Sequence, residues 1–437
     1  MRQEELYRKA SQVIPGGVNS STRLNRALGM PFYASRAAGS HVWDVEGRKY
    51  VDMNCAHGAA LLGHAHPLLQ EALKTATTCG YLHSYETEYH EQTARKVCEY
   101  IPCAERVRFC SSGSEATLHL IRVCRAYTGK SKIIRVEGHF HGYHELIYIG
   151  GHPPHDRLGE NREQPYVEST GIPQAFADLI VPIPFNDIEV LRETIDHHHK
   201  DAAMLILEPV NYNCGCILPD PDYLETARKL TREAGILLFF DEVQSSFKKS
   251  KGGAQEDYGV VPDVCTIGKS LGGGLPLSAF CGRAEVMDLY QPTGPVQHSG
   301  TFNGHLIPVL SGLAFLSEIG KQSFYAHLQN LEARFHQGMD RIIESLGLNM
   351  IVPHHGARFD FLLGRTTPAR RYEDTFCHNN ETMLAILRGC WKRGVYFHDY
   401  GGAPVHHGYS IQHTPDDIDT VLNVLEDTLK EEEKLLR

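Results

Sequence analysis

The stretch that decides the fold is Thr266-Ile-Gly-Lys269-Ser-Leu-Gly-Gly-Gly-Leu-Pro276, in which a lysine follows a short apolar strand and precedes three glycines. Such glycines let a backbone wrap closely around a ligand. Two nucleotide-binding motifs are excluded, because a P-loop would need glycine at Asp263 and a dinucleotide fingerprint would need it at Leu277. A lone lysine is more often a solvated surface charge, so the stretch needs support from its surroundings.

Short, continuously apolar runs lie on the N-terminal side of this stretch, spaced as βαβ units require. Such runs are typical of parallel strands buried on both faces. From about residue 303 the pattern turns helical and ends in a closing helix, Pro415–Leu436. We predict an α/β fold with a mostly parallel central sheet in a large domain (71–310), and a smaller α/β domain assembled from both chain ends (1–70 and 311–437). The predicted strands are 106–110, 132–136, 178–182, 203–207, 236–240 and 263–267, and one predicted helix is 117–127.

Composition narrows the class of protein. The 437 residues carry a formal charge of 43 − 53 = −10, which argues against a nucleic-acid or anionic-membrane partner. No apolar run approaches the ~20 residues of a membrane helix, and no secretion signal is visible at the N-terminus. Twelve cysteines without a CxxC pair indicate reduced thiols rather than a disulfide framework. We therefore expect a cytoplasmic globular protein.

Two further features fall at predicted strand ends, where α/β sheets bind ligands. The segment Cys110-Ser-Ser-Gly-Ser-Glu115 joins a strand to a helix, so its glycine, hydroxyls and helix N-terminus suit a phosphate. An ordinary serine N-cap remains the alternative. Asp241 follows five apolar residues, and its carboxylate is costly to bury without a cationic partner. A helix cap or a structural ion pair remains open for Asp241 taken alone.

The three features together predict a pyridoxal phosphate site. The lysine forms a Schiff base with the cofactor's aldehyde, the carboxylate keeps the pyridine nitrogen protonated, and the helix terminus holds the phosphate. Lys269 and Asp241 are 28 residues apart, which is one βαβ-sized step between adjacent strands.

With these motifs in order, the chain resembles the class III pyridoxal-phosphate-dependent aminotransferases, which have the aspartate-aminotransferase fold (fold type I). It is most similar to the branch that contains glutamate-1-semialdehyde 2,1-aminomutase and the β-amino-acid aminotransferases. The resemblance covers nearly the whole chain, from Ile14–Arg23 and Gly39–Asp52 through FCSSGSEAT, EGHFHGYHE, LEPV and LLFFDEVQSSF to TIGKSLGGGLPLSAFCGR, PTGPVQHSGTFNG and SIQHTPDDID.

The resemblance implies a role for each matching residue. Lys269 would be the Schiff-base lysine that also moves the substrate proton, and Asp241 would pair with the pyridinium nitrogen. Phe140 would stack on the cofactor ring, where many relatives have tyrosine. The other implied cofactor residues are Ser112, Gly113 and Ser114 at the phosphate, Val243 on the opposite ring face, Gln244 and Asn213 near the phenolic oxygen, Glu208 as a supporting carboxylate, and Thr301 reaching the phosphate from the other subunit of a homodimer with shared active sites.

Three residues are candidates for substrate binding. Arg23 matches the arginine that holds the substrate carboxylate in the aminomutase-like branch, and its guanidinium suits bidentate binding; an exposed loop arginine is the alternative. His406 and His407 lie where the family's substrate pocket is lined, although loop histidines without a function remain equally open.

Two departures from the family bear on the reaction. Val405 stands where the aminomutase typically has a glutamate at the active-site entry, and residues 150–173 are charged and proline-rich, unlike the mutase lid. Loss of gating parts favours release of the keto product. We therefore predict a ping-pong aminotransferase that takes an α- or β-amino acid or related amine as donor and a 2-oxo acid as acceptor. The alternatives are glutamate-1-semialdehyde 2,1-aminomutase and, more remotely, a cofactor-binding protein without turnover.

The 26 histidines invite a metal hypothesis, but their clusters lack a nearby cysteine or carboxylate at zinc-ligand spacing. We predict no metal site.

Overall fold

The computed structural model describes residues 2–80, 84–432 and 436. Its largest sheet has seven strands in the order β4-β10-β9-β8-β7-β5-β6. Strands β9, β8, β7, β5 and β6 run parallel, whereas β10 is antiparallel to both its neighbours. The strands are β4 (Arg106–Cys110), β5 (Lys132–Val136), β6 (Ile180–Ile183), β7 (Ala202–Leu207), β8 (Leu237–Glu242), β9 (Val264–Ile267) and β10 (Ser278–Gly282). The predicted α/β fold with a mostly parallel sheet is confirmed.

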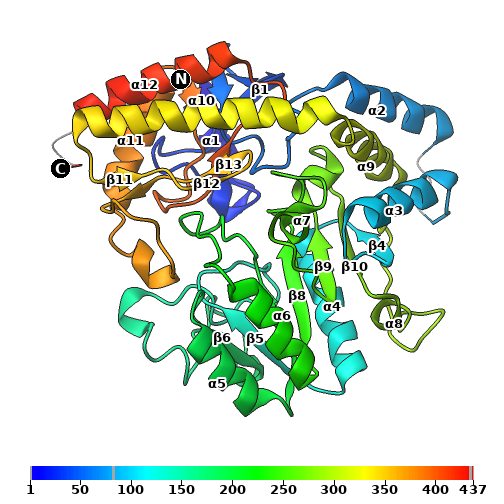
Figure 1. Ribbon diagram of the computed structural model, residues 1–437. Helices are drawn as coiled ribbons and strands as arrows, with labels where there is room; N and C mark the ends of the chain where they lie inside the picture. Colours follow the sequence, from blue (N-terminus) through cyan, green and yellow to red (C-terminus); the bar gives the residue numbers. More distant parts are fainter. Residues whose placement is uncertain (1, 81–83, 433–435, 437) are drawn as a thin grey trace.

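Helices cover both faces of this sheet (Figure 1). On β8, Leu238 and Phe240 belong to one apolar cluster, and Leu237 and Phe239 belong to another. Each fully buried side chain of this size stabilises the fold by about 1.5–3 kcal/mol. The first cluster includes residues of α5 (Ile188–His198) and α6 (Tyr223–Ala234), and the second includes residues of α4 (Gly113–Thr128). Strand β8 is therefore apolar along its length because both of its faces are buried, as the sequence analysis predicted.

The predicted strands agree with the observed ones to within two residues at each end, but the sequence analysis did not predict β10. This strand follows directly after the glycine-rich loop and reads Ser-Ala-Phe-Cys-Gly, a run of mostly small residues. Its identity as a strand comes from pairing with β4 and β9 on either side. Strand propensity alone does not reveal such a segment, because cross-strand packing determines it.

A second sheet joins the two ends of the chain. It has the order β1-β2-β3-β15, and Val395 of the C-terminal part pairs in parallel with Val51 of the N-terminal part. The prediction that both ends build the smaller unit agrees with this pairing, while its boundaries at 70 and 310 stay a prediction. The elements are β1 (Ala34–Ala38), β2 (His41–Asp44), β3 (Lys49–Asp52) and β15 (Val395–Tyr396), with helices α10 (Gln322–Leu346), α11 (Asn380–Lys392) and α12 (Pro415–Glu431).

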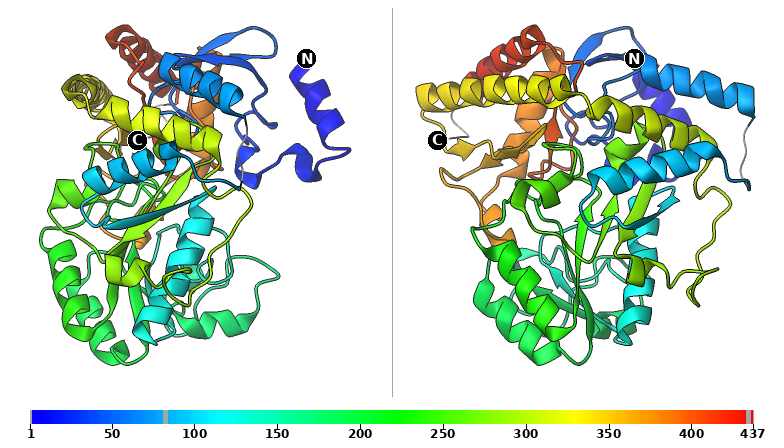
Figure 2. Two further views of the ribbon diagram at one scale, coloured as in Figure 1. Left: turned by 90° about the vertical axis from the view of Figure 1, so that its right-hand side faces the viewer. Right: turned by 45° about the vertical axis from the view of Figure 1, so that its right-hand side comes forward.

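The long α10 and the closing α12 lie side by side across the top of the molecule (Figures 1 and 2). Helix α12 ends at Glu431, and residues 433–435 of the longer predicted helix lie outside the described part of the chain. The remaining long helices are α1 (Arg2–Ala10), α2 (Pro67–Cys79), α3 (Glu88–Tyr100) and α9 (Leu306–Ile319). Within the described residues, no helix has both the length and the hydropathy needed to cross a membrane.

Candidate active site

A cavity of about 230 Å³ lies at the carboxyl ends of β4, β7, β8 and β9. All cofactor residues predicted from the sequence line it, except Thr301. Three lining residues were missed, namely His141, Gly142 and Ser278. The lining consists of Ser112, Gly113, Ser114, Phe140, His141, Gly142, Glu208, Asn213, Asp241, Val243, Gln244, Lys269 and Ser278.

One end of the cavity is the N-terminus of α4. Ser112 caps this helix, because its Oγ accepts from the N–H of Glu115 at 3.3 Å, while the Glu115 carboxylate accepts from the N–H groups of Ser111 and Ser112. The capping alternative for Ser112 therefore holds, and it is compatible with an anion site. The first-turn N–H groups of Gly113 and Ser114 have no intrahelical acceptor and lie at the cavity, where the helix dipole favours a phosphate.

Gly142 keeps this anion end open. It has a φ of +107°, and a Cβ at this position would lie 2.6 Å from the Oγ of Ser114. We expect Gly142→Ala to displace Ser114 and to weaken binding of pyridoxal 5′-phosphate by about tenfold, measured by titration of the apoprotein. Gly129→Ala is the matched control, since Gly129 also has a positive φ but open space around it. Equal affinity in both variants would contradict a role of Ser114 in phosphate binding.

Asp241 is held in place by three donors, one of which is the backbone N–H of Val243 at 3.1 Å. Its carboxylate accepts from the Oγ1 of Thr266 at 2.8 Å and lies 2.8 Å from the Nδ1 of His141. Burial lowers the pKa of His141, although the bond to Asp241 opposes this shift. The neutral ring can donate from Nδ1 to the Asp241 carboxylate. The sequence predicted only that the segment around His141 stacks on the cofactor, because nothing in the spacing relates His141 to Asp241.

Lys269 sits at the end of β9 with a φ of 44°, a left-handed conformation that is strained for a residue with a side chain. Removal of its amine from water lowers the pKa of Lys269 to about 8, although the carboxylates of Glu208 and Asp241 oppose this. An amine with this pKa is partly unprotonated near neutral pH, as a nucleophile must be. Strain and a lowered pKa together indicate a functional lysine.

Glu208 holds the part of the cavity wall that contains Phe140 and Asn213. Its carboxyl group accepts from the backbone N–H of Phe140 at 2.7 Å and from the Nδ2 of Asn213 at 2.8 Å. Burial, and then the charge of Asp241, raise the pKa of Glu208 to about 8. Through these bonds Glu208 fixes the segment that presents the Phe140 ring to the cavity.

Gln244 provides a test of the fit to a cofactor. Both polar atoms of its amide are buried without a hydrogen-bond partner in the described part of the chain. Such atoms are costly unless a ligand pairs with them. With an anion cradle, a buried carboxylate and a nucleophilic amine in the same cavity, the residues present fit pyridoxal phosphate, whose ring carries an oxygen for such an amide.

The remaining predicted residues lie elsewhere. Arg23 is exposed and lines a separate hollow with His57, His64 and His398, and Thr301 is exposed on a loop outside the cavity. His406 is buried and bonds to Arg358. His407 is also buried, and its ring packs against Phe361 and Phe397. The position of His407 is that of a core residue, so the structure does not support its predicted contact with substrate.

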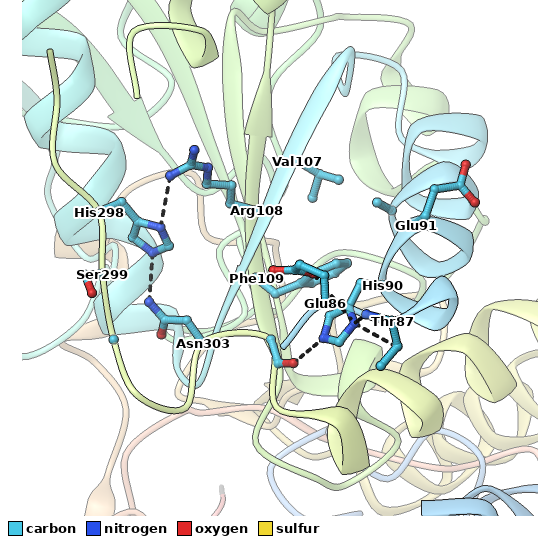
Figure 3. A pocket seen from close by; sticks show the side chains of 13 residues that line it. Glu86, Thr87, His90, Glu91, Val107, Arg108, Phe109, His298, Ser299 and Asn303 are labelled. Atoms are coloured by element: carbon cyan, nitrogen blue, oxygen red, sulfur yellow. Dashed lines mark hydrogen bonds and ion pairs between the residues drawn. The ribbon is translucent and has the colours of Figure 1, made fainter. Parts of the chain in front are cut away.

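A larger hollow of about 600 Å³ shares no lining residue with the cavity that contains Lys269 (Figure 3). The loop that carries Thr301 forms one wall, and α3 with β4 forms the other. A hydrogen bond joins Arg108 of β4 to His298 of the loop, and a second one joins His298 to Asn303 within the loop. It has none of the predicted cofactor residues, so its size does not make it the active site.

The fold also brings together three cysteines that sequence spacing did not relate. Cys103, Cys265 and Cys281 are buried, with sulfur atoms within 4.8 Å of one another. Thiols are ligands for soft metal ions, but the group lies in the core and is separate from the cavity.

Comparison with known proteins identifies the family of the chain. The family profile described as "Aminotransferase class-III" matches residues 24–429. The chain is 37% identical over 395 residues to a protein of Methanosarcina acetivorans named glutamate-1-semialdehyde 2,1-aminomutase, covering 90% of this chain and 91% of that protein. A protein of the same name from Methanobrevibacter smithii is 38% identical over 91% of both chains. Among solved structures, an omega-transaminase from Sphaerobacter thermophilus superposes with a TM-score of 0.91 at 27% identity, covering 98% of this chain and 97% of that one.

Proposed function

Since the chain belongs to the class-III aminotransferase family, we propose that it moves an amino group between carbon atoms of substrates that carry a carboxylate. It is a pyridoxal-phosphate-dependent enzyme. The observation that carries the proposal is the placement of the strained Lys269 beside the anchored Asp241 in a cavity with an anion cradle. These groups also argue against a cofactor-binding protein without turnover.

The residues of the cavity have separate roles in the reaction. The cofactor supplies an electron sink for the carbon that loses its proton. The amine of Lys269 accepts the proton from that carbon and returns it to a second one. Asp241, fixed by His141 and Thr266, would hold a negative charge against the cofactor's ring nitrogen, and the N-terminus of α4 would hold the phosphate. Phe140 and Val243 would enclose the ring and exclude water.

The first candidate reaction is that of glutamate-1-semialdehyde 2,1-aminomutase, in which the amino group returns to the same carbon skeleton. Its support is the name of the curated relatives, which are 34–38% identical over 90% or more of this chain. These relatives support the aminomutase more directly than the aminotransferase that the sequence analysis preferred.

The second candidate is an intermolecular aminotransferase, and a specific feature of the chain favours it. Residues 150–173, expected to differ from a mutase lid, are fastened to the large domain. Asn161 donates to the carboxylate of Glu137 at 2.9 Å, and the carboxylate of Glu168 lies 3.9 Å from the Nη1 of Arg135 on β5. A segment bonded in this way is poorly suited to close over a retained intermediate, and Val405 supplies no carboxylate at the entry.

One experiment separates the two reactions. The holoenzyme is given glutamate 1-semialdehyde without an amino acceptor, and separately a panel of amino acids and amines with a 2-oxo acid. Rapid conversion of the semialdehyde to 5-aminolevulinate supports the aminomutase, whereas a stoichiometric keto product formed from one donor supports the aminotransferase. Turnover of neither would contradict the proposed function.

We further propose a cytoplasmic homodimer in which Thr301 completes the partner's phosphate site. We expect co-expressed Lys269→Ala and Thr301→Ala chains to regain activity that each variant lacks alone, because a hybrid dimer with shared sites contains one site with both native residues. The measurement is the activity of purified hybrid dimers against both parental dimers. No gain in the hybrid would contradict shared sites.

A further inference from the structure

Arg358 is a buried cation with only neutral partners. It lies on β13 (Arg358–Phe359) and is 1% exposed. Its Nη1 donates to the carbonyl of Asn54 at 3.2 Å, and its Nη2 donates to the carbonyl and ring of His406. No carboxylate in the described part of the chain forms an ion pair with it, and its Nε–H has no partner. A guanidinium cannot shed its charge in a protein, so this burial is costly without a counter-ion.

The acidic residues nearest to Arg358 are engaged elsewhere. Asp52 lies 2.6 Å from the Nε2 of His64. Asp360 accepts from the backbone N–H of Gly215 at 3.1 Å, and burial raises its pKa well above the usual range, which disfavours its charged form. Burial, and then the charge of Arg358, lower the pKa of nearby Lys248 well below its usual range, and its amine bonds to the hydroxyl of Ser270. In the described part of the chain, Arg358 is therefore the charged group of this region that lacks a counter-ion.

The unpaired Nε of Arg358 lies beside Gly58, together with the amide of the cavity residue Gln244. A Cβ on Gly58 would lie 3.4 Å from this Nε, 3.2 Å from the Nε2 of Gln244 and 3.4 Å from its Oε1. All three atoms are buried and unpartnered. Gln244 lines the cavity that also contains Lys269, and the charge of Arg358 contributes to the lowered pKa of Lys269. The missing side chain of Gly58 thus leaves donors of two residues together beside the reacting amine.

We propose that Arg358, flanked by the amide of Gln244, binds a carboxylate that is attached directly to the reacting carbon, as in a 2-oxo acid or an α-amino acid. The Nε–H of Arg358 and one N–H of Gln244 donate to this carboxylate, which provides the missing counter-ion. This subsite rests on the proposed function and names its substrate class. Arg23, exposed in the neighbouring hollow, is left to bind a second, distal carboxylate.

The subsite bears on the choice of reaction. Glutamate 1-semialdehyde has a single carboxylate, separated by two methylene groups from the carbon that bears the amine, and one distal cation is enough to hold it. A carboxylate on the reacting carbon occurs in the donors and acceptors of intermolecular transfer. Arg358 therefore favours the second candidate.

The test compares two acceptors that differ by one carboxylate. The amino-loaded holoenzyme is mixed with pyruvate or with propanal, and single-turnover rates are followed by absorbance. We expect Arg358→Gln to lower kcat/KM for pyruvate by about 30-fold, as for a lost hydrogen bond to a charged group, and to change that for propanal less than about threefold. Arg358→Lys should restore part of the rate because it keeps the charge.

Carboxylate binding gives a readout that needs no turnover. Propionate is expected to raise the Tm of the wild-type holoenzyme and of Arg23→Gln, but not that of Arg358→Gln. Arg228→Gln is the control for loss of a mostly buried arginine elsewhere, since Arg228 pairs with Asp263 at 2.8 Å. It should lower the Tm while keeping the response to propionate.

Failure of the subsite and failure of the proposed function are distinguishable. Equal losses with pyruvate and propanal in Arg358→Gln, or no loss with either, would overturn the subsite while wild-type turnover still supports the function. If the wild type converts no oxo acid, the rise in Tm with propionate is the test. Loss of this rise in Arg358→Gln supports the subsite, and a rise equal to that of the wild type overturns it. Should Arg358→Gln not fold, Arg358→Lys replaces it: a partial loss with pyruvate that exceeds the loss with propanal supports the subsite, and equal losses with both acceptors overturn it.

Discussion

Lys269→Ala is expected to lose turnover by about 10⁴-fold or more, because proton transfer by a positioned side chain alone contributes ~10²–10⁴-fold and the covalent attachment of the cofactor is lost as well. The protein should still bind pyridoxal 5′-phosphate, since the cradle at α4 and the anchored Asp241 do not depend on the lysine. The measurements are steady-state activity and cofactor absorbance after gel filtration.

Borohydride reduction followed by peptide mapping identifies the attachment site directly. We expect the label on Lys269 in the wild type and no label in Lys269→Ala. Lys249→Ala, which removes an exposed lysine of the same region, is the control and should keep both label and activity. An unlabelled Lys269 in active enzyme would refute the assignment.

Asp241→Asn is expected to lower turnover by about 10²–10³-fold, the loss typical when one preorganised electrostatic group is removed from a site. The amide is close in size to the carboxylate but has no charge to keep the ring nitrogen protonated. The pKa of Glu208, raised by burial and by the charge of Asp241, should fall in this variant because a neighbouring negative charge is gone. The measurements are single-turnover rates and their dependence on pH.

Asp241→Glu is the matched variant, since it keeps the charge and changes only its position. It should recover part of the rate, whereas a purely structural role of Asp241 would make the longer side chain at least as harmful as the amide. Near-wild-type turnover in Asp241→Asn would show that Asp241 acts only as an acceptor for His141 and Thr266.

The sequence by itself determined the fold class and the chemistry-bearing residues of the cavity. Apolar runs bounded by turn residues predicted β7, β8 and β9, because a strand buried on both faces must be apolar along its length. Lys269, Asp241 and Gly113 could be placed from the order of the chain, since parallel strands bring their carboxyl ends to one edge of the sheet. Local pattern carries this information, because each residue's neighbours in sequence are also its neighbours in the element.

The tertiary structure alone decided which distant residues meet. His141 supports Asp241 across 100 positions, and Arg358 reaches Gln244 and the Lys269 cavity from the other end of the chain. The predicted substrate residue His407 lies instead in an aromatic core. A local sequence pattern does not reveal the contacts of His141, Arg358 or His407, since a buried charge or ring looks the same in sequence wherever it packs. The contact of His141 with Asp241 forms within the large domain, whereas the pairing of β3 with β15 joins the two chain ends that carry Gly58 and Arg358.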